Sequence, residues 1–192
     1  MCECFRFYCR HSQIHIGPTG YKANIWQPAF FLGPALVDPR TTVLVAPYVA
    51  VRAQYVRQAG ERGITADIRK PSLNALPRLL IVPVESLGDG DLLGFLFSHK
   101  QRIVRIVFDE AHILGTETHY RPRLQQAHHL RRSLAKPVTV LSATMPPRLL
   151  AVVCQQLLMS EPMVLRQSSI RANAAVRTTL VLVHRLTEAD RY

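Results

Sequence analysis

The feature that most constrains this chain is a run dense in β-branched and apolar residues, Ile103–Phe108, that ends directly in two carboxylates, Asp109 and Glu110. A run of this length and composition predicts a strand buried on both faces, which is typical of a parallel sheet in an α/β protein. Open α/β sheets bind their ligands at the carboxyl ends of the strands. We therefore expect Asp109 and Glu110 to lie at a ligand-binding edge.

Two carboxylates on one rigid edge suit a metal-bound nucleotide. Asp109 can hold Mg²⁺, directly or through water, while Glu110 orients the water that attacks the γ-phosphate. The alternative is that Asp109–His112 forms a solvated acidic turn. The four residues alone do not separate the two interpretations.

A second apolar run, Pro137–Leu141, ends in Ser142, Ala143 and Thr144. Two buried strands that each end in polar side chains indicate one shared crevice. The alternative for Ser142 and Thr144 is an ordinary cap between a strand and a turn.

Apolar runs alternate with helical patterns along the rest of the chain. We expect strands near 41–47, 79–84, 103–108, 137–141, 162–166 and 178–183, and helices near 49–62, 90–98, 122–134 and 147–158. This alternation implies right-handed crossovers and a mostly parallel sheet with helices on both faces. A chain of 192 residues with 48% hydrophobic content is the size of one such domain.

A glycine-bearing segment, Gly17–Ala23, follows a short candidate strand at Ile14–Ile16. It is similar to a phosphate-binding loop, in which backbone amides wrap the phosphates, a lysine meets the β- and γ-oxygens and a hydroxyl ligates Mg²⁺. The residues that we expect to contact a nucleotide are Gly17, Thr19, Gly20 and Lys22.

The same segment departs from that loop. One glycine-bearing position is missing, Tyr21 does not tolerate the positive φ that glycine supplies, and Ala23 replaces the hydroxyl that ligates Mg²⁺. We therefore expect impaired binding of magnesium ATP. The alternative is a plain Gly-Pro turn. The helix expected next carries Pro28 and Pro34, which disfavour a helix interior.

Together these motifs resemble, in order, those of superfamily 2 DEAD/DEAH-box helicases. Asp109–His112 resembles motif II and Ser142–Thr144 resembles motif III. Thr41–Gln54 is similar to motif Ia, whose helix start can receive a DNA phosphate, and Leu80–Ser86 is similar to motif Ib. Thr118–Pro122 resembles the aromatic-rich loop of RecQ-type helicases.

The resemblance implies a RecA-like P-loop NTPase fold, a three-layer sandwich with a mostly parallel sheet. It implies the first motor domain of a RecQ-like DNA helicase, of the kind seen in divergent fungal copies, with ATP and Mg²⁺ as cofactors and DNA as partner. Members of that family unwind DNA in the 3'-5' direction. Catalytic or coupling roles fall on Asp109, Glu110, His112, Ser142 and Thr144, and nucleic-acid contacts fall on Arg52, Tyr120 and Arg121.

The expected organisation has three parts. Residues 1–13 form an N-terminal tail, 14–168 the ATP-binding RecA-like domain, and 169–192 a linker and the start of a second motor domain, because Arg166–Ala174 resembles the segment by which RecQ-type enzymes enter that domain. An arginine finger from a second domain is worth on the order of 10³ to 10⁵ in rate. We therefore expect no unwinding by this chain alone, and a non-catalytic nucleic-acid-binding remnant is the alternative function.

The net charge of +11 favours polyanion partners. Cys2, Cys4, Cys9 and His11 supply enough ligands for zinc but lack the paired spacing of common zinc sites, so an unstructured N-terminus is the preferred alternative. Since no run of 18 or more apolar residues occurs, we expect no membrane span and a soluble protein in the nucleus or elsewhere inside the cell.

Overall fold

The computed structural model describes residues 12–17, 28–167 and 181–185 of the chain. The strands are β1 (Gln13–Ile16), β2 (Thr41–Ala46), β3 (Ala66–Ile68), β4 (Leu79–Pro83), β5 (Ile103–Phe108), β6 (Val138–Ser142), β7 (Met163–Gln167) and β8 (Val181–Arg185). The α-helices are α3 (Ala29–Val37), α4 (Val49–Gly60), α5 (Gly90–Ser98), α6 (Ile113–Thr116), α7 (Ala127–Leu134) and α8 (Pro147–Gln156). The 3₁₀ turns are η1 (Val84–Ser86), η2 (Lys100–Arg102) and η3 (Pro122–Gln126).

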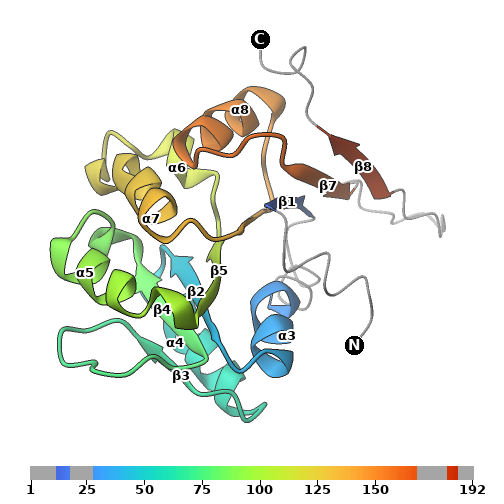
Figure 1. The fold of residues 1–192 in the computed structure, drawn as a ribbon. Helices are drawn as coiled ribbons and strands as arrows, with labels where there is room; N and C mark the ends of the chain where they lie inside the picture. Colours follow the sequence, from blue (N-terminus) through green and yellow to red (C-terminus); the bar gives the residue numbers. More distant parts are fainter. Residues whose placement is uncertain (1–11, 18–27, 168–180, 186–192) are drawn as a thin grey trace.

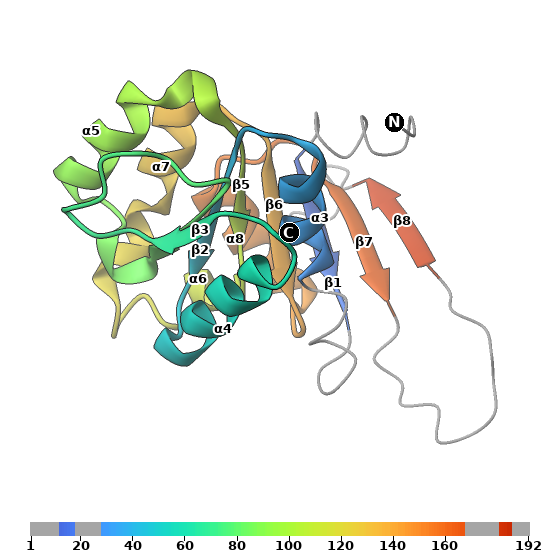
Figure 2. The same cartoon turned by 90° about the horizontal axis from the view of Figure 1, so that it is seen from below.

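The strands form one eight-stranded sheet in the order β3-β4-β2-β5-β6-β1-β7-β8. Every neighbouring pair is parallel except β7 and β8, which run antiparallel (Figure 2). In the register, Phe108 lies beside both Val45 and Val140, and Ile16 lies beside Ser142. The carboxyl ends of β1, β2, β5 and β6 therefore meet at one edge of the sheet.

Helices cover both faces of this sheet, so the molecule has three layers (Figure 1). One apolar cluster joins the sheet to α5, α6, α7 and α8 through side chains such as Leu96, Leu130 and Val153. A second cluster joins the opposite face to α3 and α4 through Phe31 and Tyr55. The three-layer α/β sandwich with a mostly parallel sheet is confirmed.

Most expected elements lie within a few residues of their expected bounds, and one differs. The single helix expected at 122–134 is wrong: its first five residues form the 3₁₀ turn η3, and α7 begins only after Gln126, whose φ of −92° and ψ of 4° lie outside the α-helical region. Neither β3 nor α6 was expected, since three or four residues are too short for a periodic signal. Helix α3 keeps Pro34 in its interior and buries Phe31, Leu32 and Ala35, which offsets the lost hydrogen bond.

The described part of the expected last strand, β8, pairs with β7 in this same sheet. Its assignment to a second motor domain stays a prediction. No helix in residues 12–17, 28–167 or 181–185 is both long and apolar enough to cross a membrane.

Candidate nucleotide site

The site lies where the carboxyl ends of β5, β6 and β1 meet. Backbone hydrogen bonds extend the sheet pairing past the strand ends: Asp109 N–H donates to Val45 O at 3.0 Å, and Ala111 N–H donates to Leu141 O at 3.0 Å. Gly17 N–H donates to Ser142 O at 3.1 Å. The sheet itself therefore brings the start of the glycine segment, the carboxylates after β5 and the hydroxyl that ends β6 to one edge.

Three side chains connect β5 to β6. His112 Nδ1 lies 3.3 Å from Glu110 Oε2 and 3.3 Å from Ser142 Oγ. The carboxylate of Glu110 raises the pKa of His112 by accepting a hydrogen bond, against a smaller opposing effect of burial. Ser142 Oγ in turn contacts the backbone of Thr144, donating to its carbonyl at 3.1 Å and lying 3.3 Å from its amide nitrogen. A change at Glu110 can therefore reach Thr144 through direct contacts.

Glu110 occupies an unusual backbone conformation. Its φ of 48° lies in the left-handed region, which costs a residue with a Cβ roughly 1–2 kcal/mol. The hydrogen bonds of Asp109 N–H and Ala111 N–H to the neighbouring strands hold the residues on either side of it. Backbone strain of this kind can mark a functional site, although Ala135, Leu158 and Glu161 also have a positive φ away from this edge.

Asp109 is nearly buried, with 3% of its surface exposed. The Tyr55 hydroxyl donates to Asp109 Oδ2 at 2.6 Å from helix α4. Within the described part of the chain, Asp109 Oδ1 is buried without a hydrogen-bond partner. Burial raises the pKa of Asp109 to about 6, although the Tyr55 hydrogen bond opposes that rise. Burial and the nearby carboxylate also raise the pKa of Tyr55, so its hydroxyl keeps its proton.

The donor set fits one kind of metal site. No group of three or more His, Cys, Asp or Glu in the described residues could enclose a metal ion. Mg²⁺ bound with a nucleotide needs only one or two carboxylates, because phosphate and water oxygens complete its shell. Asp109 Oδ1, a buried carboxylate oxygen without a partner, fits a single ligand of that kind.

Several expected site residues lie outside the described residues. Gly17 is described, but Thr19, Gly20 and Lys22 are not, and neither are the possible zinc ligands Cys2, Cys4, Cys9 and His11. Their roles stay predictions.

The expected nucleic-acid residues lie in two environments. Arg52 is 8% exposed, and its Nη2 donates to Pro47 O at 3.0 Å and to Glu85 Oε2 at 3.1 Å. It therefore connects the segment after β2 to η1 after β4, and its guanidinium contacts protein oxygens. Tyr120 is 88% exposed. The Arg121 guanidinium pairs with Glu117 at 3.4 Å and lies 5.9 Å from the ring centre of Tyr48.

The sequence did not identify three residues of this edge. Tyr55 reaches Asp109 from α4, Tyr48 lies beside Arg121 at the start of α4, and Glu85 pairs with Arg52 from η1 after β4. Glu85 had a partial signal as the acid of the motif Ib-like segment. No local pattern distinguishes Tyr55 from an ordinary core tyrosine on the apolar side of a helix.

The comparisons with known proteins agree with this geometry at the level of the fold. No protein-family model matches the chain. Among solved structures, it is similar to the crystal structure of the Pyrococcus furiosus Hef helicase domain, with a TM-score of 0.60 and 14% sequence identity. The match covers 84% of this chain and 37% of that one, so this chain spans well under half of its neighbour's length. The chain has a RecA-like α/β fold of the kind found in that helicase domain.

Proposed function

We propose that this chain is the nucleotide-binding motor domain of an ATP-dependent DNA helicase of the RecQ type. The observation that carries the proposal is the contact series from Glu110 through His112 to Ser142 at the carboxyl edge. A surface turn or a simple strand cap would not need these side chains to meet. The helicase fold and the order of the motifs support the same function.

Each side chain at the edge has a proposed task. Asp109 Oδ1, which has no hydrogen-bond partner among the described residues, would hold Mg²⁺, and the ion would neutralise charge on the phosphates. Glu110 orients the attacking water and accepts a proton from it. His112 exchanges its contact with Glu110 as the charge at the γ-phosphate changes, and Ser142 passes that change to the backbone of Thr144. Lys22 and the segment Gly17–Gly20 are the proposed phosphate contacts.

The nucleic-acid side of the proposal uses the same edge. Arg52 holds the segments after β2 and β4 together, so that exposed backbone amides at the start of α4 can meet a phosphate. Tyr120 and Arg121 lie in the loop that resembles the aromatic-rich segment of RecQ-type helicases, and the exposed ring of Tyr120 is available for stacking on a base. DNA as the substrate is proposed from that resemblance.

The experiment combines nucleotide binding with hydrolysis. ATP affinity is measured with and without Mg²⁺, and DNA-stimulated hydrolysis is compared for the wild type, Glu110→Gln and His112→Ala. Glu61→Gln is the matched control, since Glu61 is an exposed carboxylate at the end of α4. We expect Glu110→Gln to abolish hydrolysis, His112→Ala to weaken its stimulation by DNA, and the control to match the wild type. Hydrolysis that survives Glu110→Gln contradicts the proposal.

A second candidate is a nucleic-acid-binding domain without ATP turnover. Tyr21 and Ala23, which replace residues that a phosphate-binding loop uses, favour it. Salt-sensitive DNA binding by a wild-type chain that has no affinity for ATP would establish this candidate instead.

A further inference from the structure

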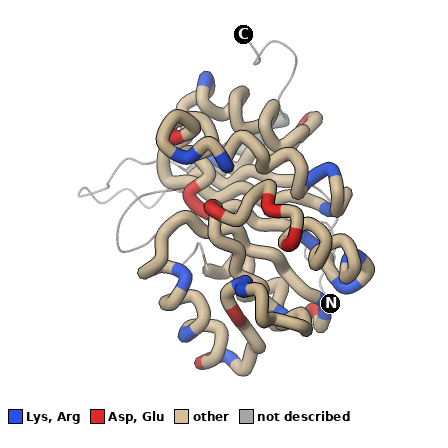
Figure 3. The backbone as a smooth tube through the Cα atoms, turned by 90° about the vertical axis from the view of Figure 1, so that its left-hand side faces the viewer, with Lys and Arg blue, Asp and Glu red and all other residues tan. Residues whose placement is uncertain are grey.

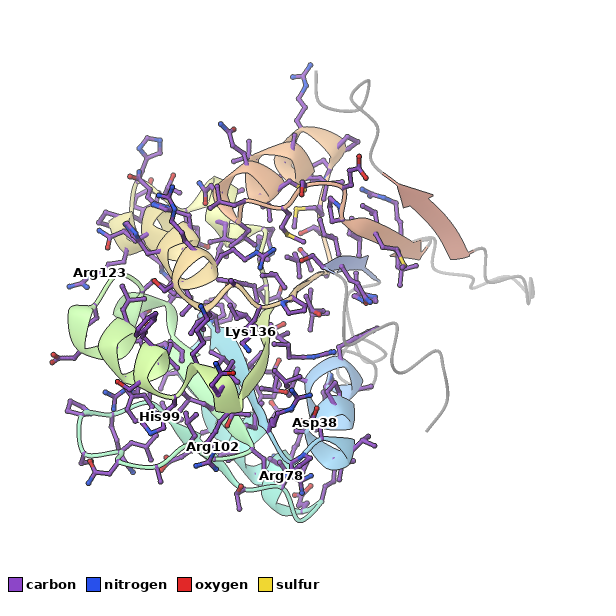
Figure 4. The ribbon with its side chains drawn as sticks, viewed as in Figure 1. Asp38, Arg78, His99, Arg102, Arg123 and Lys136 are labelled. Carbon is purple, nitrogen blue, oxygen red and sulfur yellow. The ribbon has the colours of Figure 1, made fainter. Side chains whose placement is uncertain are left out.

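The amino ends of four neighbouring strands carry a row of basic residues. Arg78 directly precedes β4, Arg40 precedes β2, Arg102 precedes β5, and Lys136 lies two residues before β6. Because these strands are adjacent in the order β4-β2-β5-β6 and all parallel, their amino ends lie at one edge, opposite the candidate nucleotide site. Figure 4 shows Arg78, Arg102 and Lys136 over this part of the molecule.

The spacing of this row suits a chain of phosphates. Neighbouring strands lie about 4.8 Å apart, so the four strand starts span about 14 Å. A row of this length can face several successive phosphates of one strand. Basic side chains held at this separation can neutralise successive phosphates without folding the nucleic acid back on itself.

The basic residues of this edge differ in whether an acidic side chain neutralises them. Arg40 pairs with Asp38 at 2.7 Å, and Arg78 donates to the carbonyls of Leu36 and Asp38 near the end of α3. In the described part of the chain, Lys100, Arg102 and Lys136 form no ion pair with an acidic residue.

Burial lowers the pKa of Lys136, and the positive charges of Arg40 and Lys100 lower it further. Arg40 and Lys100 therefore each lie close enough to Lys136 to repel it. A bound polyanion would relieve that repulsion.

Aromatic rings lie beside the row. Phe97, at the end of α5, is 61% exposed, and Lys100 Nζ lies 5.7 Å from the centre of its ring. Next to it, the Phe95 and His99 rings lie 4.7 Å apart, and Arg69 lies 4.4 Å from the centre of the Phe95 ring. Phe97 is the exposed ring of this group, since Phe95 and His99 are half-buried. An exposed ring beside cations is typical of surfaces on which unpaired bases stack while the backbone follows the positive charges.

Basic residues also lie on other parts of the molecule. Figure 3 shows them spread along the backbone, with acidic residues between them.

We propose that the amino edge is a second binding surface, for single-stranded nucleic acid. Lys100, Arg102 and Lys136 contact phosphates, and Phe97 stacks on a base. The surface is separate from the carboxyl edge and needs no nucleotide, so it goes beyond the motor function. A strand held at both edges would remain attached to the domain while the carboxyl edge releases and rebinds it.

The test measures binding of a fluorescein-labelled oligothymidylate to the whole chain by anisotropy, without nucleotide, between about 50 and 200 mM salt. The variant combines Lys100→Ala, Arg102→Ala and Lys136→Ala. Each phosphate contact to a single strand contributes about 0.7 to the slope of log affinity against log salt, so we expect the slope to become shallower by about 2. The matched control replaces Arg57, Arg123 and Arg148, three exposed arginines on other elements, with alanine and is expected to keep the wild-type slope.

Phe97→Ala separates stacking from charge. We expect it to weaken binding about tenfold at every salt concentration, with an unchanged slope. Arg102→Ala alone, at an exposed position, is a second variant should the triple variant fail to fold, and it is expected to reduce the slope by about 0.7.

Two outcomes overturn the proposal. An equal loss of slope in the control means that binding depends only on total charge. Unchanged oligonucleotide binding, with loss of sedimentation on phosphatidylserine vesicles, means that the edge binds a membrane surface instead. ATP affinity is measured in parallel for the wild type and the triple variant. A wild-type chain that binds no ATP contradicts the motor proposal but does not contradict the proposal for the amino edge.

Discussion

Replacing Tyr55 with phenylalanine tests the contact between α4 and the carboxyl edge. The substitution removes the hydroxyl that donates to Asp109 Oδ2 at 2.6 Å, while the ring can keep its edge contact with Phe31, whose centroid is 4.7 Å away. Asp109 is 3% exposed, and its other oxygen already lacks a partner among the described residues. Without the hydroxyl, water replaces the lost hydrogen bond poorly.

The size of the effect depends on pH. Burial raises the pKa of Asp109 from 3.8 to about 6, so the folded state holds this proton more tightly than the unfolded state. Its contribution to stability is therefore largest below the unfolded pKa and falls as pH rises towards 6, by on the order of 3 kcal/mol in total. The Tyr55 hydrogen bond lowers this pKa, so Tyr55→Phe raises it further and extends the fall to higher pH.

We expect Tyr55→Phe to reduce the free energy of unfolding by about 1 kcal/mol near pH 4.5, where it removes a neutral hydrogen bond. The reduction grows to about 2–3 kcal/mol near pH 8, where the lost bond is to a carboxylate. Urea unfolding followed by circular dichroism at both pH values measures the difference. Tyr48→Phe is the control, since Tyr48 is 40% exposed, and we expect it to change stability by less than about 0.5 kcal/mol. A Tyr55→Phe deficit that is the same at both pH values refutes the reasoning.

Three further predictions concern the same edge. Glu110→Gly is expected to raise the free energy of unfolding by about 0.5–1 kcal/mol while abolishing hydrolysis, because glycine tolerates the φ of 48°; a stability loss above about 1 kcal/mol in thermal melts contradicts the assignment of strain. Affinity for magnesium ATP, measured by calorimetry, is expected to fall as pH is lowered through about 6, because protonated Asp109 does not ligate Mg²⁺. In Asp109→Asn we expect an affinity below that of the wild type and no such pH dependence. Arg52→Ala is expected to destabilise the fold by about 2 kcal/mol, because Pro47 O loses its donor. Glu85→Gln is expected to cost less than about 1 kcal/mol, because Glu85 is exposed. Equal costs of the two variants in urea titrations would show that the ion pair, rather than the contact with the Pro47 carbonyl, stabilises the fold.

The sequence determined most of the strands and the edge. Ile103–Phe108 is a strand with the expected bounds, because five of its six residues are apolar and leave no exposed face. Parallel pairing then follows from the helices between strands, and it necessarily brings Glu110 and Ser142 to the same edge. These inferences rest on periodicity and connection length, which are local properties.

Only the tertiary structure decided which partners the individual side chains have. The sequence marked Arg52 as a DNA contact, and the fold directs its guanidinium to Pro47 and Glu85. It gave no sign that Tyr55 would meet Asp109, or that a row of cations would form before β4, β2, β5 and β6, which are separated in sequence and reordered in space. The physical reason is that strand order and helix placement follow from how apolar surfaces pack across the whole domain, and hydrogen bonds and charges then act between residues that the chain alone keeps far apart.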